Sequence, residues 1–258
     1  MTVGIRGMGL IGGSFEKAFA AAGHEVLNLK GADGAVIGRC ELVIVALPPQ
    51  VVAPWIKENA RFFGEGAMVT DAAGIKREIC EALEAKARAA KWTYIGGHPM
   101  AGREVSGYEN ALGDLFRGAS MILTPYEWTR AEEVERLKAM LAPCGFGRFT
   151  VTDAAQHDLM IAYTSQLAHV VSSAYVRDEL AQAHAGFSAG SFQDMTRVAT
   201  VDPVLWTELF LANRDALDEV LSRLIGRLLS YRDAINSADA MSLMRLLEEG
   251  RKAKEASK

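Results

Sequence analysis

The chain has 258 residues, half of them hydrophobic, and a formal net charge of −4 at pH 7. This charge gives no electrostatic basis for nucleic-acid binding, and no apolar run reaches the roughly 18 residues that a membrane span needs. Three widely separated cysteines, Cys40, Cys80 and Cys144, argue against a disulfide framework or a zinc site. With no signal-peptide pattern before the first strand, we expect a cytoplasmic protein without a nucleic-acid or membrane partner.

Residues 1–152 alternate short, apolar, β-rich runs with helical patterns. The helix after the first strand carries Phe15, Ala18, Phe19 and Ala22 on one face and stops before Gly23, and another helix starts near residue 75. Such alternation predicts crossover connections and a largely parallel sheet. Strands are expected at residues 2–5, 24–29, 41–47, 67–71, 92–96, 120–124 and 147–151.

The pattern changes after residue 152, where no further strand is expected. Three long helices are predicted over residues 153–183, 203–235 and 237–257. Their Leu- and Ala-rich faces exceed what one thin helical layer can bury, so we expect a homodimer formed through this half. The predicted fold is therefore α/β, with a Rossmann-like dinucleotide-binding domain over residues 1–152 and an all-helical substrate and dimerisation domain over residues 153–258.

The first chemical motif is "GIRGMGLIGGS", in which Gly7, Gly9 and Gly12 form a GxGxxG between a strand and a helix. That context makes it a dinucleotide-binding motif, whereas the spacing alone is weak. Gly7 permits a tight turn, Gly9 lets a pyrophosphate approach the backbone, and Gly12 allows close helix–strand packing. Leu10 and Ile11 open the helix, whose unpaired N–H groups favour phosphate.

The nucleotide half of this domain is expected to be shortened. Residues 31–40 are too few for a full crossover helix. Lys30 stands where an NAD site usually has an acidic residue for the ribose hydroxyls, and Arg39 could add a second positive charge. We therefore expect NADP or NAD as the cofactor, with NADP slightly favoured.

A second stretch, "GGHPMAGREVSG" over residues 96–107, follows the strand expected at 92–96. Pro99 restricts the backbone of His98, which would lie at the C-terminal end of that strand, where open α/β sheets bind ligands. A tight loop with an incidental histidine is an equally good interpretation of this segment taken alone.

The helical half contains two histidines, His157 and His169, spaced with Ile161 and Ser165 at intervals of four along one helix. The two histidines would be about 18 Å apart, which argues against a shared metal. His157, beside Asp158, is expected to cap and brace the helix start. Arg197 is compatible with a surface position, an internal ion pair, or a partner for a planar carboxylate.

Together, "GLIGGS", "GGHPMAG", "HD…TSQLAH", "GSFQDMTR" and "DPVLW" resemble the prephenate/arogenate dehydrogenase family of tyrosine biosynthesis over nearly the whole chain. The resemblance implies oxidative decarboxylation of prephenate to 4-hydroxyphenylpyruvate, or of arogenate to tyrosine, with hydride transfer to NAD(P)⁺. It implies that His98 takes the proton of the ring hydroxyl and that Arg197 binds a substrate carboxylate. It also places three residues around the substrate: His169, Gly190 and Trp206.

Two departures from the family pattern leave alternatives open. In "DAAGIK", Gly74 occupies the position of a family serine that helps to orient the catalytic histidine, and the nucleotide half is short. A dehydrogenase of a modified substrate, such as 4-amino-4-deoxyprephenate, or a non-catalytic nucleotide-binding relative would also fit. No regulatory domain is expected after the helical half, so tyrosine feedback through such a domain is not expected.

Overall fold

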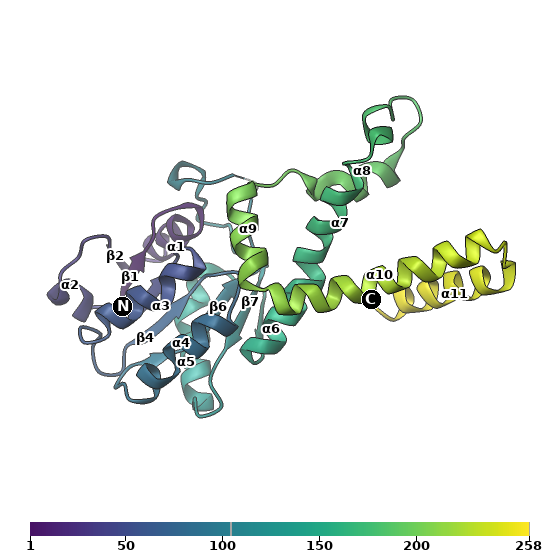
Figure 1. Ribbon diagram of the computed structural model, residues 1–258. Coiled ribbons are helices and arrows are strands. Elements are labelled where there is room, and N and C mark those ends of the chain that lie inside the picture. Colours follow the sequence, from purple (N-terminus) through teal and green to yellow (C-terminus); the bar gives the residue numbers. More distant parts are fainter. Residues whose placement is uncertain (104, 258) are drawn as a thin grey trace.

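A computed structural model describes residues 1–103 and 105–257 and shows a sheet-containing half followed by a helical half (Figure 1). The first sheet has five strands in the order β2-β1-β3-β4-β5, and every neighbouring pair is parallel. The Rossmann-like, parallel arrangement expected from the sequence is confirmed. Its strands are β1 (Thr2–Arg6), β2 (Glu25–Asn28), β3 (Leu42–Val45), β4 (Met68–Asp71) and β5 (Thr93–Tyr94).

Helices cover both faces of this sheet, which explains the nearly continuous apolar strands. All four residues of β3 and all four of β4 are buried, as is typical of parallel strands packed on both sides. On one face Val3 and Ile5 pack with Phe15 and Phe19 of the first helix. The helices of this half are α1 (Leu10–Ala21), α2 (Gly34–Gly38), α3 (Pro49–Asn59), α4 (Arg77–Arg88) and α5 (Ala131–Leu141).

A second, three-stranded sheet corrects the expectation for residues 92–96. The chain leaves the first sheet after Tyr94 and starts a new strand, β6 (Gly96–Pro99), which pairs antiparallel with β7 (Ser120–Thr124). β7 in turn pairs parallel with β8 (Arg148–Val151). His98 therefore lies within a strand of the second sheet, and not in a loop after a strand of the first.

Glycines allow the two sheets to meet. A Cβ atom on Gly97 would lie 2.5 Å from the backbone oxygen of Asp71 at the end of β4. A Cβ atom on Gly96 would lie 2.3 Å from Oγ1 of Thr124. Because neither position has room for a side chain, β6 passes directly over the C-terminal end of β4 and brings His98 to the ligand-binding edge.

The first long helix of the helical half is interrupted by a change in winding. It consists of α6 (Ala154–Ile161), a π-helical turn (Ala162–Gln166) and α7 (Leu167–Tyr175). It ends at Tyr175, short of the expected residue 183, and an unpredicted helix, α8 (Gly190–Thr196), follows. Single-turn 3₁₀ helices lie at Tyr108–Asn110, Ala142–Cys144, Glu179–Gln182 and Arg197–Ala199.

The helix expected over residues 203–235 is two helices, α9 (Pro203–Ala212) and α10 (Arg214–Asn236). The break falls at buried Asn213, whose amide donates to the backbone oxygen of Asp158 and to Oε1 of Gln166. These bonds tie the break to the first long helix. The last helix, α11 (Ala240–Ala256), folds back on α10, and this hairpin projects away from the sheets (Figure 1). No helix among the described residues combines the length and apolarity needed to cross a membrane.

Candidate active site

The glycine-rich turn between β1 and α1 has the shape that a dinucleotide requires. Gly7 has a φ of +102°, and a Cβ atom there would lie 2.1 Å from the backbone oxygen of Ala46. A Cβ atom on Gly12 would lie 1.7 Å from the backbone oxygen of Gly7, so the helix packs tightly on the turn. Gly9, in contrast, faces open space, because among the described residues beyond its chain neighbours no atom lies within 4 Å of an added Cβ.

The start of α1 completes this turn. Gly9 is its N-cap and offers no side-chain cap, so the N–H groups of the first turn, including those of Leu10 and Ile11, lack partners within the helix. The open space above Gly9 and these N–H groups together fit the pyrophosphate of a dinucleotide. All five residues expected from the motif therefore lie in the turn between β1 and α1 or in the first turn of α1.

The end of β4 supports the backbone on which His98 stands. Asp71 is fully buried and forms an ion pair with the equally buried Lys76. Its carboxylate also accepts hydrogen bonds from the Tyr94 hydroxyl at 2.7 Å, from the Ala73 N–H at 2.8 Å and from the Gly97 N–H at 3.3 Å. A buried charge with this many partners fixes the loop after β4 against the residue that precedes His98.

A chain of hydrogen bonds leads from His98 into the helical half. Nδ1 of His98 lies 2.9 Å from Nε2 of His157, and Nδ1 of His157 lies 2.7 Å from Oδ1 of Asp158. The Asp158 carboxylate also accepts the backbone N–H groups of Lys76 and Arg77 at 2.8 and 2.9 Å. The ring of His98 is thus held on its Nδ1 side by His157, which Asp158 in turn fixes against the start of α4.

These hydrogen bonds determine which ring nitrogen of His98 carries the proton. An ionised Asp158 only accepts, so it fixes the proton of His157 on Nδ1 and leaves Nε2 of His157 as an acceptor. The Nδ1–H of His98 then donates to His157, and Nε2 of His98 carries the free lone pair. A Cβ atom on Gly74 would lie 3.8 Å from this Nε2 and 3.7 Å from Cδ2 of Leu209, so Nε2 faces the space between the loop after β4 and α9.

Both histidines are held neutral. Burial lowers the pKa of His98 well below its ordinary value of 6.5, and His157 and the Lys76 ammonium lower it further. Burial also lowers the pKa of His157, although the hydrogen bond to Asp158 opposes this effect. A neutral imidazole with a free Nε2 is able to accept a proton from a hydroxyl group within hydrogen-bond distance of that nitrogen.

Helix α9 connects His98 to a second group of side chains. Leu209 faces Gly74, and Trp206, three residues earlier on the same helix, packs its ring against His169 of α7 with centroids 3.7 Å apart. Nδ1 of His169 lies 2.8 Å from the backbone oxygen of Val198. His169 and Trp206 are therefore brought together next to Arg197, which is exposed and has no ion-pair partner among the described residues.

Comparison with known families accounts for both halves of the chain. Residues 8–150 match the model of the prephenate dehydrogenase nucleotide-binding domain, and residues 153–249 match that of the prephenate dehydrogenase dimerization domain. The chain belongs to the prephenate dehydrogenase family. The resemblance inferred from the motifs is thus confirmed, and so, at the level of the family, is dimerisation through the helical half.

Individual members of the prephenate dehydrogenase family are similar over the full chain. A prephenate dehydrogenase of Lactococcus lactis subsp. cremoris is 31% identical over 98% of this chain and 76% of its own length. The crystal structure of Synechocystis arogenate dehydrogenase superposes with a TM-score of 0.86 at 25% identity and covers 100% of both chains. Prephenate dehydrogenase from A. aeolicus, solved with hydroxyphenyl propionate and NAD⁺, has the same fold, with a TM-score of 0.81 at 23% identity over 100% of this chain and 98% of that one.

In the single chain, Gly190 is not brought beside the other candidate substrate residues, and Arg39 is not brought beside Lys30. Gly190 begins α8, is exposed, and has no atom within 4 Å of an added Cβ. Figure 1 shows α8 at the far end of α7, away from β6, the strand that contains His98. Arg39 pairs at 2.5 Å with Glu25, the first residue of β2, and so does not serve the nucleotide-binding edge at the other end of that strand.

The expected role of His157 was partly wrong. The cap of α6 is Asp153, which accepts the N–H of Gln156, whereas His157 is buried against His98. Asp158 was expected only as part of a local brace, although its carboxylate joins three separate backbone or side-chain donors. The signal that could have indicated this role is the unusual placement of an adjacent His-Asp pair on the buried side of a helix.

Proposed function

We propose that this protein oxidises and decarboxylates prephenate or arogenate with NAD(P)⁺. The observation that carries the proposal is the free Nε2 of neutral His98, which faces the space between the nucleotide-binding half and α9. The similarity to prephenate and arogenate dehydrogenases over nearly the whole chain supports the same reaction. The glycine-rich turn supports the cofactor class, because its open backbone surface fits a dinucleotide.

In the proposed reaction, Nε2 of His98 accepts the proton of the substrate's ring hydroxyl. A bound NAD(P)⁺ supplies the hydride acceptor for the ring carbon. The C–H bond breaks as the carbonyl forms, and the ring carboxylate then leaves as CO₂ while its bonding electrons complete the aromatic ring. Nε2 of His98 returns the proton to the ring oxygen, so the products are CO₂, the reduced cofactor and either 4-hydroxyphenylpyruvate or tyrosine. The proton on His98 is stabilised by the hydrogen bonds that run through His157 to Asp158.

We assign the binding roles from residue chemistry and position. Arg197 is proposed to bind a substrate carboxylate, because its planar guanidinium suits that group and has no competing ion-pair partner among the described residues. His169 and Trp206 are proposed to form the wall beside the substrate, supported by their contact next to Arg197. Gly190 remains a proposed pocket residue from the family resemblance, with no support from the geometry of the single chain.

Two broader features belong to the same proposal. We place the boundary between the dinucleotide-binding domain and the helical domain after residue 152, supported by family matches at residues 8–150 and 153–249. We also place the protein in the cytoplasm. Cys40, Cys80 and Cys144 are all buried and unpaired, which is consistent with a reducing compartment.

The test is a turnover assay of the purified protein with prephenate and, separately, arogenate. Formation of reduced cofactor should match release of CO₂ and of the aromatic product in equal amounts. Reduction without CO₂ release, or no turnover of either substrate, would contradict the proposal. Turnover confined to 4-amino-4-deoxyprephenate would instead assign the modified substrate considered from the sequence.

A further inference from the structure

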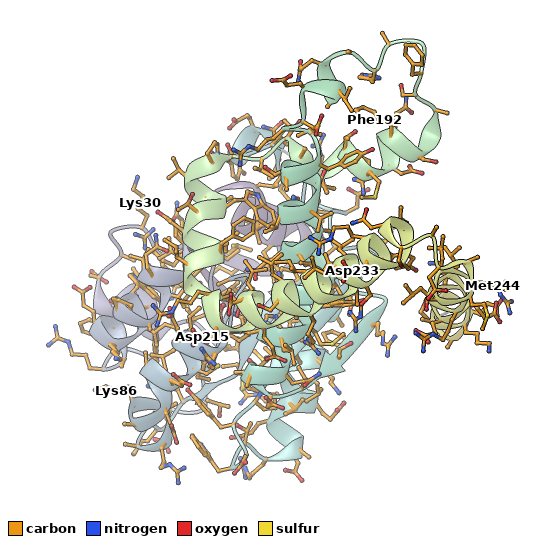
Figure 2. The ribbon with its side chains drawn as sticks, turned by 45° about the vertical axis from the view of Figure 1, so that its right-hand side comes forward. Lys30, Lys86, Phe192, Asp215, Asp233 and Met244 are labelled. Carbon is orange, nitrogen blue, oxygen red and sulfur yellow. The ribbon has the colours of Figure 1, made fainter. Side chains whose placement is uncertain are left out.

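Two cations lie at the edge of the first sheet where the adenosine end of a dinucleotide would bind. Arg6 is the last residue of β1, and Lys30 lies two residues beyond the end of β2. The parallel ladder continues past β2, because the N–H of Leu29 donates to the backbone oxygen of Ile5 at 2.8 Å. Lys30 therefore lies beside the start of the glycine-rich turn, and Figure 2 shows its side chain extending outward from this edge.

The carboxylates near β2 do not compete for this position. Glu25 accepts the Thr2 hydroxyl at 2.8 Å and pairs with Arg39, and Glu41 accepts the Thr2 N–H at 3.0 Å, all at the N-terminal ends of the strands. Asp33 caps α2 by accepting the N–H of residue 36 at 2.9 Å. Among the described residues, neither Arg6 nor Lys30 forms an ion pair.

The local backbone holds both cations at the same edge. Side chains alternate along β1, so Arg6 lies on the same face as Gly4, where an added Cβ would meet Leu29. Only the single-turn helix α2 follows β2 on this face, and Arg6 stays partly exposed. Oδ1 of Asn28 accepts the N–H of Lys30 at 2.9 Å, which fixes the turn that carries the lysine.

We propose that Arg6 and Lys30 bind the 2′-phosphate of NADP⁺ and make the protein select the phosphorylated cofactor. NAD sites use an acidic residue at the end of the second strand to accept the ribose hydroxyls, and that residue repels a 2′-phosphate. Here no acidic acceptor stands at that position, and two cationic donors lie at neighbouring strand ends, Arg6 at the end of β1 and Lys30 after β2. The guanidinium of Arg6 supplies a fork that matches phosphate oxygens, and the Lys30 ammonium supplies a second charge.

The test measures binding of 2′,5′-ADP and 5′-AMP to the full-length protein by calorimetry, without substrate. The wild type should bind 2′,5′-ADP at least about tenfold more tightly than 5′-AMP, which corresponds to about 1.4 kcal/mol. Arg6→Ala and Lys30→Ala should each reduce the affinity for 2′,5′-ADP about threefold or more, and the double variant should bind both probes equally. Lys30→Arg should keep the preference, and Arg39→Ala is the matched control that should leave both affinities unchanged.

Equal affinity of the wild type for the two probes would overturn the proposal. So would parallel losses for both probes in the double variant, because these would show a general effect on the nucleotide site. The proposal rests on the dinucleotide site of the proposed function, but its readout does not depend on the reaction. Selective binding of 2′,5′-ADP by a protein that turns over neither prephenate nor arogenate would leave this inference standing and reject the proposed reaction.

Discussion

At the scale of single residues, the position of one proton on His98 determines what the site can do. Asp158 lies in the helical half, far from His98 in sequence, yet it reaches that ring through His157. Because both ring nitrogens of His157 are engaged, the lone pair of His98 is left on the side facing Gly74. Gly74 offers no hydroxyl to His98, and the orientation of the His98 ring comes from the hydrogen bond of its Nδ1 to His157.

Replacing His98 should test its role as the base. His98→Asn should lower kcat about 10²–10⁴-fold, the usual contribution of a positioned general base. The affinity for the cofactor should remain nearly unchanged, because the glycine-rich turn is separate from His98. His24→Asn, just before β2, is the control and should keep the wild-type kcat. A His98→Asn variant with near wild-type kcat would exclude His98 from proton transfer.

The pH dependence follows from the lowered pKa of His98. Its neutral form should persist as pH falls through 6.5, so kcat/KM should decline only at a lower pH. The free energy of unfolding should also decrease as the pH is lowered. Below pH 6.5 the unfolded chain binds protons that the folded protein rejects, so the free energy of unfolding should fall as pH falls toward the folded-state pKa. A pH–rate profile with an acid limb centred at or above 6.5 would contradict this cause.

His157 is a positioning residue, and its test needs two variants. His157→Phe removes the acceptor for the Nδ1–H of His98, and a base displaced by about 1 Å can cost about 10²-fold in kcat. His157→Gln keeps an amide oxygen that can accept this hydrogen bond and should restore much of the rate. Equal kcat values in the two variants, with equal thermal stability, would show that packing alone explains the residue.

At the scale of elements, the sequence predicts those helices and strands whose limits depend on the local pattern of residues. The buried strands and α1 were predicted because apolar runs and a glycine stop determine them. The division of residues 92–96 was not predictable, because it depends on the contact of Gly97 with the distant end of β4. The break at Asn213 likewise depends on acceptors on the other long helix.

The same limit applies to the candidate site. Motifs that are local in sequence indicate His98, His169, Arg197 and Trp206. The partnership between His98 and His157 joins two motifs 59 residues apart, and neither motif indicates the other. The charges around β2 indicated Lys30 as a cofactor-binding residue. The pairing of Arg39 with Glu25, and the position of Arg6 beside Lys30, could be recognised only from the register of the strands.

The passage of β6 over β4 can be tested with one methyl group. Gly97→Ala would place its Cβ 2.5 Å from a backbone oxygen, so the strand must shift. Overpacking of this kind typically costs about 1–3 kcal/mol of unfolding free energy, and His98 should be displaced with the strand. Gly102→Ala is the matched control, because no atom of residues 1–103 and 105–257, apart from its chain neighbours, lies within 4 Å of its added Cβ. Urea unfolding that shows equal stability for both variants would contradict the close contact.

At the scale of the whole molecule, the α10–α11 hairpin leaves apolar side chains uncovered in the single chain. Leu228, Ile235 and Met244 are 57%, 61% and 68% exposed, and Figure 2 shows Met244 on the projecting hairpin. An exposed apolar surface of this kind is typical of an interface. Leu228, Ile235 and Met244 lie within residues 153–249, which match the family's dimerization domain, so the partner is a second copy of the chain.

Charged substitutions on this surface should separate the dimer. Leu228→Glu combined with Ile235→Glu should convert a dimer into a 27.9 kDa monomer at micromolar concentration, measured by sedimentation. Burying two unpaired carboxylates is far more costly than leaving them in water. Lys254→Glu, near the end of α11, is the control. It changes the net charge but places no carboxylate on the apolar surface, so it should leave the dimer intact. A double variant that stays dimeric would place the interface elsewhere.

The π-helical turn at Ala162–Gln166 sets the rotational phase between the two histidines on either side of it. His157 and His169 are twelve positions apart, which in a regular α-helix places them about 120° apart around the axis. A π turn takes up one extra residue, which leaves about eleven α-helical steps and an offset of only about 20°. One inserted residue therefore lets a single helix direct His157 to His98 and His169 to Trp206. Regular α-helical winding of the same twelve residues, without the π turn, would instead rotate α7, with His169, by about 100° away from Trp206.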